Sequence, residues 1–255
     1  MNYIDVTICQ LFALLLFVHL FFLIGTRKKR NDIADVAWGL GFVLLAVVGT
    51  IHNPNTKTII VLVLLMFWGF RLARHIFNRF RSHKEEDMRY QEFRKAWGSR
   101  QVLGAYFKVY LLQGFSLILV AMPILVLARF SDNSFSFINM IGVALWLFGF
   151  VFEVVADKQL KDFVKDKKPG QIMKNGLWSY SRHPNYFGEA VIWWGIFLIS
   201  WGTPYFYIGL IGPITITLLL RFVSGVPMAE ARYNDNPEFI EYKKNTPAFI
   251  PNFFK

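Results

Sequence analysis

The side chains best placed to do chemistry are ionisable residues in or beside long apolar stretches of the chain. Glu189 is followed directly by the apolar residues 190–194. Glu153 and Asp157 stand four residues apart, which would place both carboxyl groups on one face of a helix. Because charged groups are costly at membrane depth, each of these three is a candidate for proton transfer or for binding a polar ligand.

Two further positions combine charge with an apolar neighbourhood, and each also has an ordinary interpretation. Asp35 begins an apolar stretch, where it could cap a helix. Arg71 and Arg74 close another stretch, which they could anchor at a membrane surface. The two carboxyl groups four residues apart could simply pair with nearby lysines.

Seven apolar stretches approach the length that a helix needs to cross the roughly 30 Å hydrocarbon core of a bilayer. They are predicted at residues 6–25, 34–51, 58–78, 106–128, 137–157, 185–201 and 204–223. Only a short turn separates the last two, so a tight hairpin and a count of six remain open. With 55% hydrophobic residues, the chain is predicted to be an all-α, polytopic membrane helix bundle.

The distribution of positive charge predicts the orientation of this bundle. Of the 28 Lys and Arg residues, only Lys57 and Arg129 fall in segments expected outside. Cytoplasmic loops collect Lys and Arg, so the N-terminus is predicted outside and the C-terminus in the cytoplasm. A basic cluster at 27–30 follows the first apolar stretch, which favours a retained helix over a cleaved signal peptide.

Composition and motifs exclude several classes of function. The net charge of +11 is explained by the orientation rule, so no nucleic-acid partner is predicted. With Cys9 as its single cysteine and five scattered histidines, the chain offers no disulfide and no metal site. It contains no P-loop and no complete dinucleotide-binding fingerprint. No repeat or flexible linker is evident, which predicts one membrane domain over residues 1–255.

One run of residues resembles a known family. Residues 176–189, GLWSYSRHPNYFGE, are similar to the steroid 5-alpha-reductase family, in particular to its bacterial branch. The resemblance extends to segments 35–42, 68–72, 86–90, 152–160, 224–227 and 247–251. The Arg-His-Pro-x-Tyr core by itself is less specific, because isoprenylcysteine-type membrane methyltransferases carry something similar.

The resemblance implies a seven-helix membrane reductase that uses NADPH to reduce the double bond of an enone in a lipophilic substrate. Negative charge develops on the ketone oxygen in the transition state, so a hydrogen-bond donor accelerates the reaction. A carboxylic acid held protonated in an apolar site can be this donor. Glu189 matches the glutamate that the family places in its site. Tyr186 and Asp35 complete the expected catalytic group.

The resemblance also suggests the cofactor and substrate contacts. Asn185 and Asp157 match family positions that hold the nicotinamide and the ribose. The phosphates of NADPH need cationic partners, and the candidates are Arg71, Arg74, Arg89, Lys174, Arg182 and His183. Glu153 and Tyr180 are further expected cofactor contacts. The residues expected to line the substrate site are Trp38, Trp68 and Trp178.

The sequence departs from the animal steroid reductases at their substrate-facing Glu and Tyr. Only Asp35 and Trp68 fall near those positions, so the expected substrate is not restricted to steroids and is steroid-like or isoprenoid-like. Two other classes stay open: an isoprenylcysteine-type methyltransferase that uses S-adenosylmethionine, and a non-catalytic membrane protein. The expected partners are a lipophilic small molecule and membrane lipid. The expected location is a bacterial inner membrane, with the cofactor site facing the cytoplasm.

Overall fold

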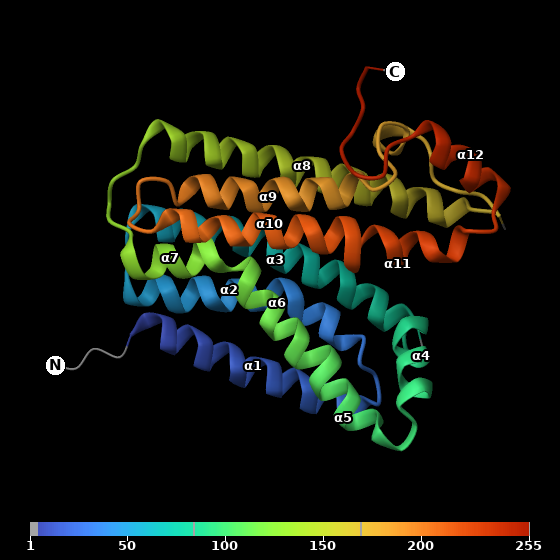
Figure 1. Ribbon diagram of the computed structural model, residues 1–255, viewed down its shortest axis with the longest axis horizontal. Helices are drawn as coiled ribbons and strands as arrows, with labels where there is room; N and C mark the ends of the chain where they lie inside the picture. The colour runs from blue at the N-terminus through green and yellow to red at the C-terminus, as the bar shows by residue number, and fades with distance from the viewer. Residues whose placement is uncertain (1–4, 84, 169, 255) are drawn as a thin grey trace. The chain divides into compact units, whose positions relative to one another are not determined.

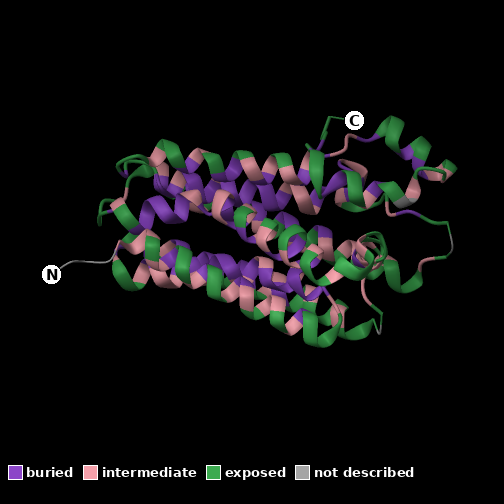
Figure 2. Cartoon of the chain, turned by 60° about the horizontal axis from the view of Figure 1, so that its bottom comes forward, coloured by how far each residue is buried: buried purple, intermediate pink, exposed green. Residues whose placement is uncertain are grey.

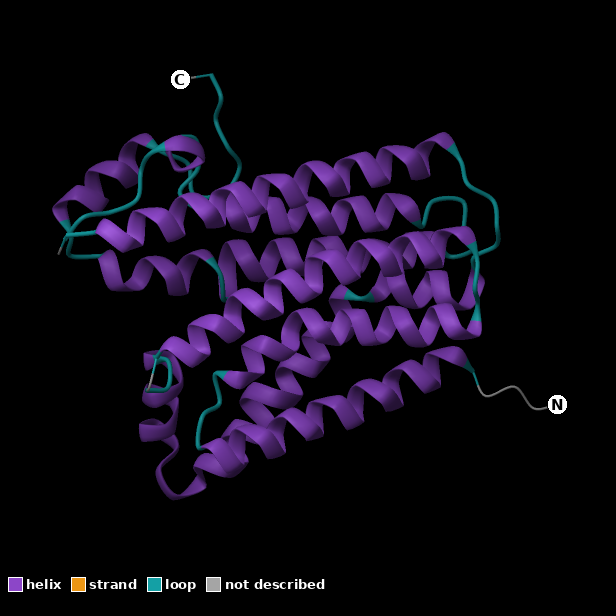
Figure 3. Cartoon of the chain, turned by 180° about the vertical axis from the view of Figure 1, so that it is seen from behind, coloured by secondary structure: helices purple, strands orange, loops and turns teal. Residues whose placement is uncertain are grey.

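The computed structural model describes residues 5–83, 85–168 and 170–254. Within these ranges the chain forms helices and loops and no strands (Figure 3). The α-helices, shown in Figure 1, are α1 (Val6–Lys28), α2 (Ile33–His52), α3 (Thr56–Ser82), α4 (Met88–Trp97), α5 (Gln101–Ala105), α6 (Leu112–Val120), α7 (Met122–Phe130), α8 (Phe137–Asp166), α9 (Pro184–Ile199), α10 (Ile211–Leu218), α11 (Val226–Glu230) and α12 (Pro237–Asn245). Short π-helical turns at Tyr106–Leu111 and Leu219–Val223 continue α5 into α6 and extend α10.

Six helical stretches of the described chain are long and apolar enough to cross a membrane. They are Val6–Lys28, Ile33–His52, Thr56–Ser82, Met88–Val120, Phe137–Asp166 and Phe206–Glu230. The predicted all-α, multi-pass membrane architecture is therefore confirmed. With 16 residues, α9 is shorter than the about 20 residues that a perpendicular span requires. A seventh span and the orientation of the termini stay predictions.

The stretch predicted at 106–128 is broken near its end. α6 ends at Val120, and α7 begins at Met122 with Pro123 in its first turn. Proline has no N–H to donate and clashes with the preceding turn, so it starts a helix more readily than it continues one. The apolar run predicted the stretch but not this break within it.

The chain packs as two compact units. The first comprises residues 1–136 and 200–211, and the second comprises residues 137–199 and 212–255. The single membrane domain predicted from the sequence stays a prediction. Each unit contains its own group of the predicted site residues.

In the first unit, α2 and α3 approach closely at a pair of glycines. A Cβ added to Gly39 would lie 2.8 Å from the Gly69 carbonyl oxygen, and one added to Gly69 would lie 2.7 Å from that of Gly39. Any larger side chain would push the two helices apart. Close by, Trp68 of α3 is completely buried against Phe42 of α2, with ring centroids 5.9 Å apart.

In the second unit, α8 and α9 meet along a seam of two glycine pairs. A Cβ on Gly149 would lie 2.7 Å from the Gly188 carbonyl oxygen, and one on Gly195 would lie 2.7 Å from that of Gly142. Most residues of α9 are buried (Figure 2). Because backbone lies against backbone at both pairs, the glycine seam sets which side chains of α8 face which side chains of α9.

Replacing Gly188 with alanine is expected to destabilise the protein by about 1–3 kcal/mol. The added Cβ would lie 2.8 Å from both the Glu153 backbone nitrogen and the Gly149 carbonyl oxygen, and backbone atoms cannot rotate away. The higher helix propensity of alanine recovers at most about 1 kcal/mol. Thermal unfolding in detergent measures the effect, with Ala144→Val, which enlarges an exposed residue of α8, as control. An unchanged melting temperature for Gly188→Ala would show that the seam can widen freely.

Candidate active site

The carboxyl groups predicted on one face of α8 lie beside the first turns of α9. Gly188, the neighbour of Glu189, packs directly on the backbone of Glu153. Both acidic side chains are buried, Glu153 with 3% and Glu189 with 8% of its surface exposed. The glycine seam therefore places the buried residues Glu153 and Glu189 where α8 and α9 pack against each other.

One helical turn away, Asn185 and Asp157 form a polar contact between the same two helices. Asn185 Nδ2 donates a hydrogen bond to Asp157 Oδ1 at 3.2 Å. Asn185 Oδ1 is buried and has no hydrogen-bond partner among the described residues. Leaving such an acceptor unsatisfied costs about 1–3 kcal/mol, so this oxygen is suited to accept a hydrogen bond from a ligand. The structure thus brings together Asn185, Asp157, Glu153 and Glu189, whose individual roles stay predictions.

Arg182 and His183 precede α9 and are both bound to Glu230 at the end of α11. Arg182 donates from Nε to Glu230 Oε1 at 2.8 Å and from Nη2 to Oε2 at 3.3 Å. His183 Nε2 lies 3.0 Å from the same Oε1. All three side chains are less than one-tenth exposed. Sequence reasoning missed Glu230, because no local pattern distinguishes it from the other acidic side chains of the C-terminal segment, Asp235, Glu238 and Glu241.

The environment of this cluster decides its charge. Burial lowers the pKa of His183 below its ordinary value, and the hydrogen bond from His183 to Glu230 opposes this only in part. A neutral imidazole at neutral pH donates its Nε2–H to Glu230. Arg182 also donates from Nη1 to the carbonyl oxygens of Thr246, at 2.6 Å, and Lys243, at 3.2 Å. These contacts bind the guanidinium to the chain itself, and its predicted role at the cofactor phosphates stays a prediction.

The turn before α9 is held between α8 and the C-terminal segment. Trp178 is buried and donates from Nε1 to the Ala156 carbonyl oxygen at 3.1 Å. Its own carbonyl oxygen accepts a hydrogen bond from Tyr242, whose hydroxyl pKa is raised by burial. Tyr186 stacks on His183 with ring centroids 5.2 Å apart. These contacts fix the position at which α9 begins.

Two predicted cofactor contacts lie at the surface of the second unit. Tyr180 is partly buried, with its ring centroid 5.1 Å from that of Phe253. Lys174 is exposed and pairs with Glu238 at 2.6 Å. Both roles stay predictions.

In the first unit, Asp35 is the centre of a second polar group. The Tyr90 hydroxyl donates to Asp35 Oδ1 at 2.6 Å, and Arg89 Nη2 donates to Oδ2 at 3.1 Å. Because α2 begins at Ile33, Asp35 lies inside the first turn and is not the capping residue. The contact with Tyr90 spans 55 positions of the chain, so no local pattern could have predicted it.

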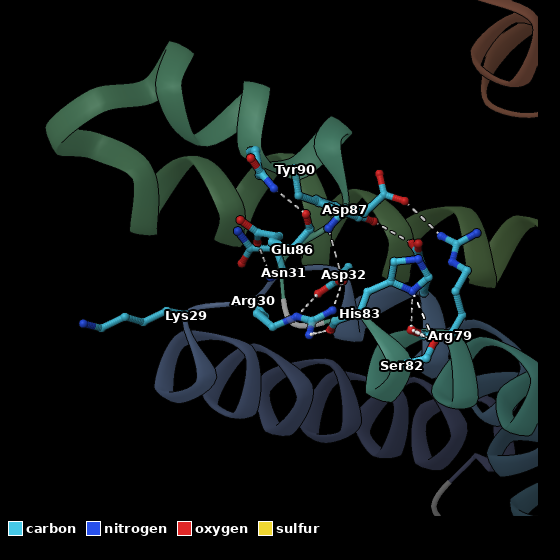
Figure 4. A network of polar contacts seen from close by, with 12 residues as sticks. Lys29, Arg30, Asn31, Asp32, Arg79, Ser82, His83, Glu86, Asp87 and Tyr90 are labelled. Carbon is cyan, nitrogen blue, oxygen red and sulfur yellow. Dashed lines mark hydrogen bonds and ion pairs between the residues drawn. The ribbon is translucent and has the colours of Figure 1, made fainter. Parts of the chain in front are cut away.

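Figure 4 shows the neighbouring part of this polar group, between the start of α2 and the start of α4. Arg30 binds Asp32 at 2.6 Å, and the backbone N–H of Asp87 donates to Asp32 Oδ2 at 3.3 Å. Arg79 of α3 pairs with Asp87 at 2.9 Å. Burial raises the pKa of Asp87, but hydrogen bonds from Arg89 and the nearby positive charges outweigh this and leave the pKa below its ordinary value. The network therefore holds an ionised carboxylate between arginines.

The remaining predicted residues of the first unit lie along α2 and α3. Trp38 packs edge-on against Phe42, with ring centroids 5.1 Å apart, and Phe42 in turn contacts Trp68. Arg71 is partly buried and Arg74 is exposed. Their predicted roles in binding substrate and cofactor stay predictions.

Comparison with known proteins places the chain among relatives. A family model described as a protein of unknown function (DUF1295) matches residues 21–246. Enzymes named 3-oxo-5-alpha-steroid 4-dehydrogenase 1 also match the chain. The enzyme of Mus musculus is 43% identical over 61 residues, which are 24% of each chain. The enzyme of Macaca fascicularis is 31% identical over 116 residues, which are 45% of this chain and 41% of the relative. An uncharacterized protein of Schizosaccharomyces pombe is 25% identical over 194 residues, 63% of this chain and 56% of the relative.

These matches confirm the predicted resemblance to steroid 5-alpha-reductases. They are partial, since the chain spans about a quarter of the length of the mouse enzyme that it matches. No solved structure matches the chain significantly.

Proposed function

The chain belongs to the DUF1295 family, which is related to the steroid 5-alpha-reductases, and from this premise we propose that it is an NADPH-dependent membrane reductase. Its similarity to the named steroid dehydrogenases suggests a membrane reductase of the steroid type. The proposed substrate is a lipophilic enone, steroid-like or isoprenoid-like. The proposed location is a bacterial inner membrane, with the cofactor site on the cytoplasmic side.

The observation that carries the proposal is a buried acid one helical turn from a half-buried amide whose oxygen is buried and unsatisfied. Glu189 and Asn185 stand four residues apart on α9, so their side chains share one face of the helix. Asp157 accepts from Asn185 Nδ2, which leaves Oδ1 as the group available to a ligand. The amide nitrogen is the donor and the Asp157 oxygen the acceptor of this bond, so the contact fixes the orientation of the amide.

The residues present fit the nicotinamide end of the cofactor. Asn185 Oδ1 is suited to accept a hydrogen bond from the carboxamide N–H of the nicotinamide. Asp157 holds the amide of Asn185 in the orientation that this contact needs. NADPH, when bound, supplies the hydride that reduces the substrate.

Glu189 is the proposed proton-bearing donor to the substrate. Its carboxylic acid donates a hydrogen bond to the carbonyl oxygen of the enone, where negative charge develops as the β carbon is reduced. Ile192 and Trp193, which follow it on α9, are completely buried and exclude water from this part of the helix. Tyr186, three residues before Glu189, stays a proposed catalytic partner.

Transfer of deuterium from cofactor to product tests this function. The purified protein in proteoliposomes receives NADPH deuterated at C4 of the nicotinamide, together with either a 3-oxo-Δ4 steroid or an isoprenoid enone. The proposal expects a reduced product that carries deuterium at the β carbon, located by mass spectrometry. In a parallel assay with S-adenosylmethionine, methyl transfer without NADPH oxidation would contradict the proposal and favour the methyltransferase class.

A further inference from the structure

An apolar groove of about 480 Å³ lies on α8 in the second unit. Its lining is Leu147, Phe148, Val151, Phe152, Val155 and Leu177. Along the groove, Leu147, Phe148 and Val151 are each about half exposed, although they are large and apolar. The groove lies within a stretch long and apolar enough to cross a membrane, so a hydrocarbon chain is its natural occupant.

The turn Gly176–Ser179 contributes Leu177 to the lining of this groove and is itself bound to α8. The Leu177 N–H donates to Gln159 Oε1 at 3.0 Å, and the Trp178 indole donates to the Ala156 carbonyl oxygen at 3.1 Å. Gly176 has a φ of +63°, and a Cβ there would lie 2.5 Å from the Gln159 side chain. Leu177 is therefore held against α8 by two hydrogen bonds and a glycine that no other residue could replace without strain.

Three lysines follow the groove residues on the same face of α8. Lys158, Lys161 and Lys165 follow Val151 and Val155 at spacings of three and four, which keep side chains on one face of a helix. With 30 residues, α8 is about 45 Å long, so its last turns extend beyond a hydrocarbon core of roughly 30 Å. Asp162 binds Lys165 at 2.6 Å, which leaves a net positive charge at Lys158 and Lys161 on this face.

We propose that the groove binds one anionic phospholipid of the surrounding bilayer, with an acyl chain along α8 and the phosphate at Lys158 and Lys161. The apolar lining matches the chain, and the lysines match the charge of the headgroup where the helix leaves the core. A second copy of the protein is a poorer occupant. Two α8 helices related by an axis along the membrane normal would bring their own lysines together.

The test is the binding of phosphatidylglycerol against phosphatidylcholine to the purified full-length chain, counted by native mass spectrometry from detergent. The charge variant is Lys158→Gln with Lys161→Gln, and its control is Lys168→Gln with Lys244→Gln, which removes two exposed lysines elsewhere in the same unit. The groove variant is Val151→Trp, and its control is Leu16→Trp, at an exposed apolar position of α1. All six positions substituted in the variants and controls are exposed, and unchanged melting temperatures verify folding.

The expected result is selective retention of one phosphatidylglycerol by the wild-type chain. The charge variant should weaken phosphatidylglycerol binding by about thirtyfold, since each lysine near a membrane surface contributes roughly fivefold. Val151→Trp should abolish retention, and neither control should change it by more than about twofold. If the charge variant and its control lost phosphatidylglycerol binding equally, the proposal would be overturned in favour of diffuse electrostatic attraction to the basic surface. Unchanged binding of phosphatidylglycerol to Val151→Trp would also overturn the proposal. So would a wild-type dimer that shows no lipid preference and that Val151→Trp dissociates.

Discussion

Replacing Glu189 with glutamine is expected to lower kcat for enone reduction by about 10²–10³ while leaving NADPH binding unchanged. Removing one preorganised donor to a developing oxyanion has an effect of this size. Glutamine keeps the volume of the buried side chain but donates a weaker hydrogen bond, because an amide N–H is much less acidic than a carboxylic acid O–H. Single-turnover oxidation of NADPH, followed by absorbance, measures the chemical step apart from product release.

The control for this variant is Glu241→Gln, which changes an exposed glutamate of α12 in the same way. It should leave kcat within about twofold, because surface substitutions of this kind are nearly neutral. Full enone-reduction activity in Glu189→Gln would contradict the assignment of Glu189 as the donor to the carbonyl oxygen.

Replacing Glu230 with alanine is expected to destabilise the protein by about 3–5 kcal/mol, because it leaves the buried Arg182 guanidinium without its counter-charge. His183 would lose the same partner, at 3.0 Å. Thermal or denaturant unfolding in detergent measures the loss. The turn that begins α9 should also become more accessible to proteolysis, since Arg182 binds the C-terminal segment through Glu230, Lys243 and Thr246.

An exposed ion pair in the same unit provides the control for Glu230. Glu238→Ala removes the partner of Lys174 and should cost less than about 1 kcal/mol. The double variant Arg182→Met with Glu230→Ala should be less destabilised than the sum of the single variants, because it leaves no buried charge behind. Additive losses would show that the two residues stabilise the protein independently of each other.

The helices were largely predictable because apolar length is a strong indicator in a membrane protein. The stretches expected at 58–78 and 137–157 mark the apolar parts of α3 and α8, but the helices continue to Ser82 and Asp166. Intrahelical hydrogen bonding does not stop where hydrophobicity stops, so polar turns such as 158–166 extend a helix beyond the core. Hydropathy indicates where a helix meets lipid and leaves its polar ends undefined.

The α8–α9 arrangement shows what sequence spacing can and cannot define at the candidate site. The separation of Glu153 and Asp157 by four residues predicted a shared helix face. Which residue of α9 would meet that face depends on the approach of Gly149 to Gly188 across the seam. Glycines occur throughout membrane helices, so their pairing becomes visible only when the two helices are seen packed.

Long-range polar partners account for the rest of what the sequence could not show. Glu230 meets Arg182 across 48 positions, and Tyr90 meets Asp35 across 55. Neither contact leaves a periodic or compositional trace, because each is made by tertiary packing. The matched family segments contained Asp35, Tyr90 and Arg182 but gave no indication of the partners that each of these residues would bind.

Cofactor binding is the most direct test of the central claim that this membrane protein is an NADPH-dependent reductase. Thermal unfolding of the detergent-purified chain is compared with NADPH, NADH and S-adenosylmethionine, and the same series is run on Asn185→Ala. Saturating ligand raises the free energy of unfolding by about 2.7 kcal/mol at 100 times its Kd. The account predicts a rise in melting temperature with NADPH, none with S-adenosylmethionine, and a reduced rise in Asn185→Ala. Stabilisation by S-adenosylmethionine alone, or by none of the three, would contradict it.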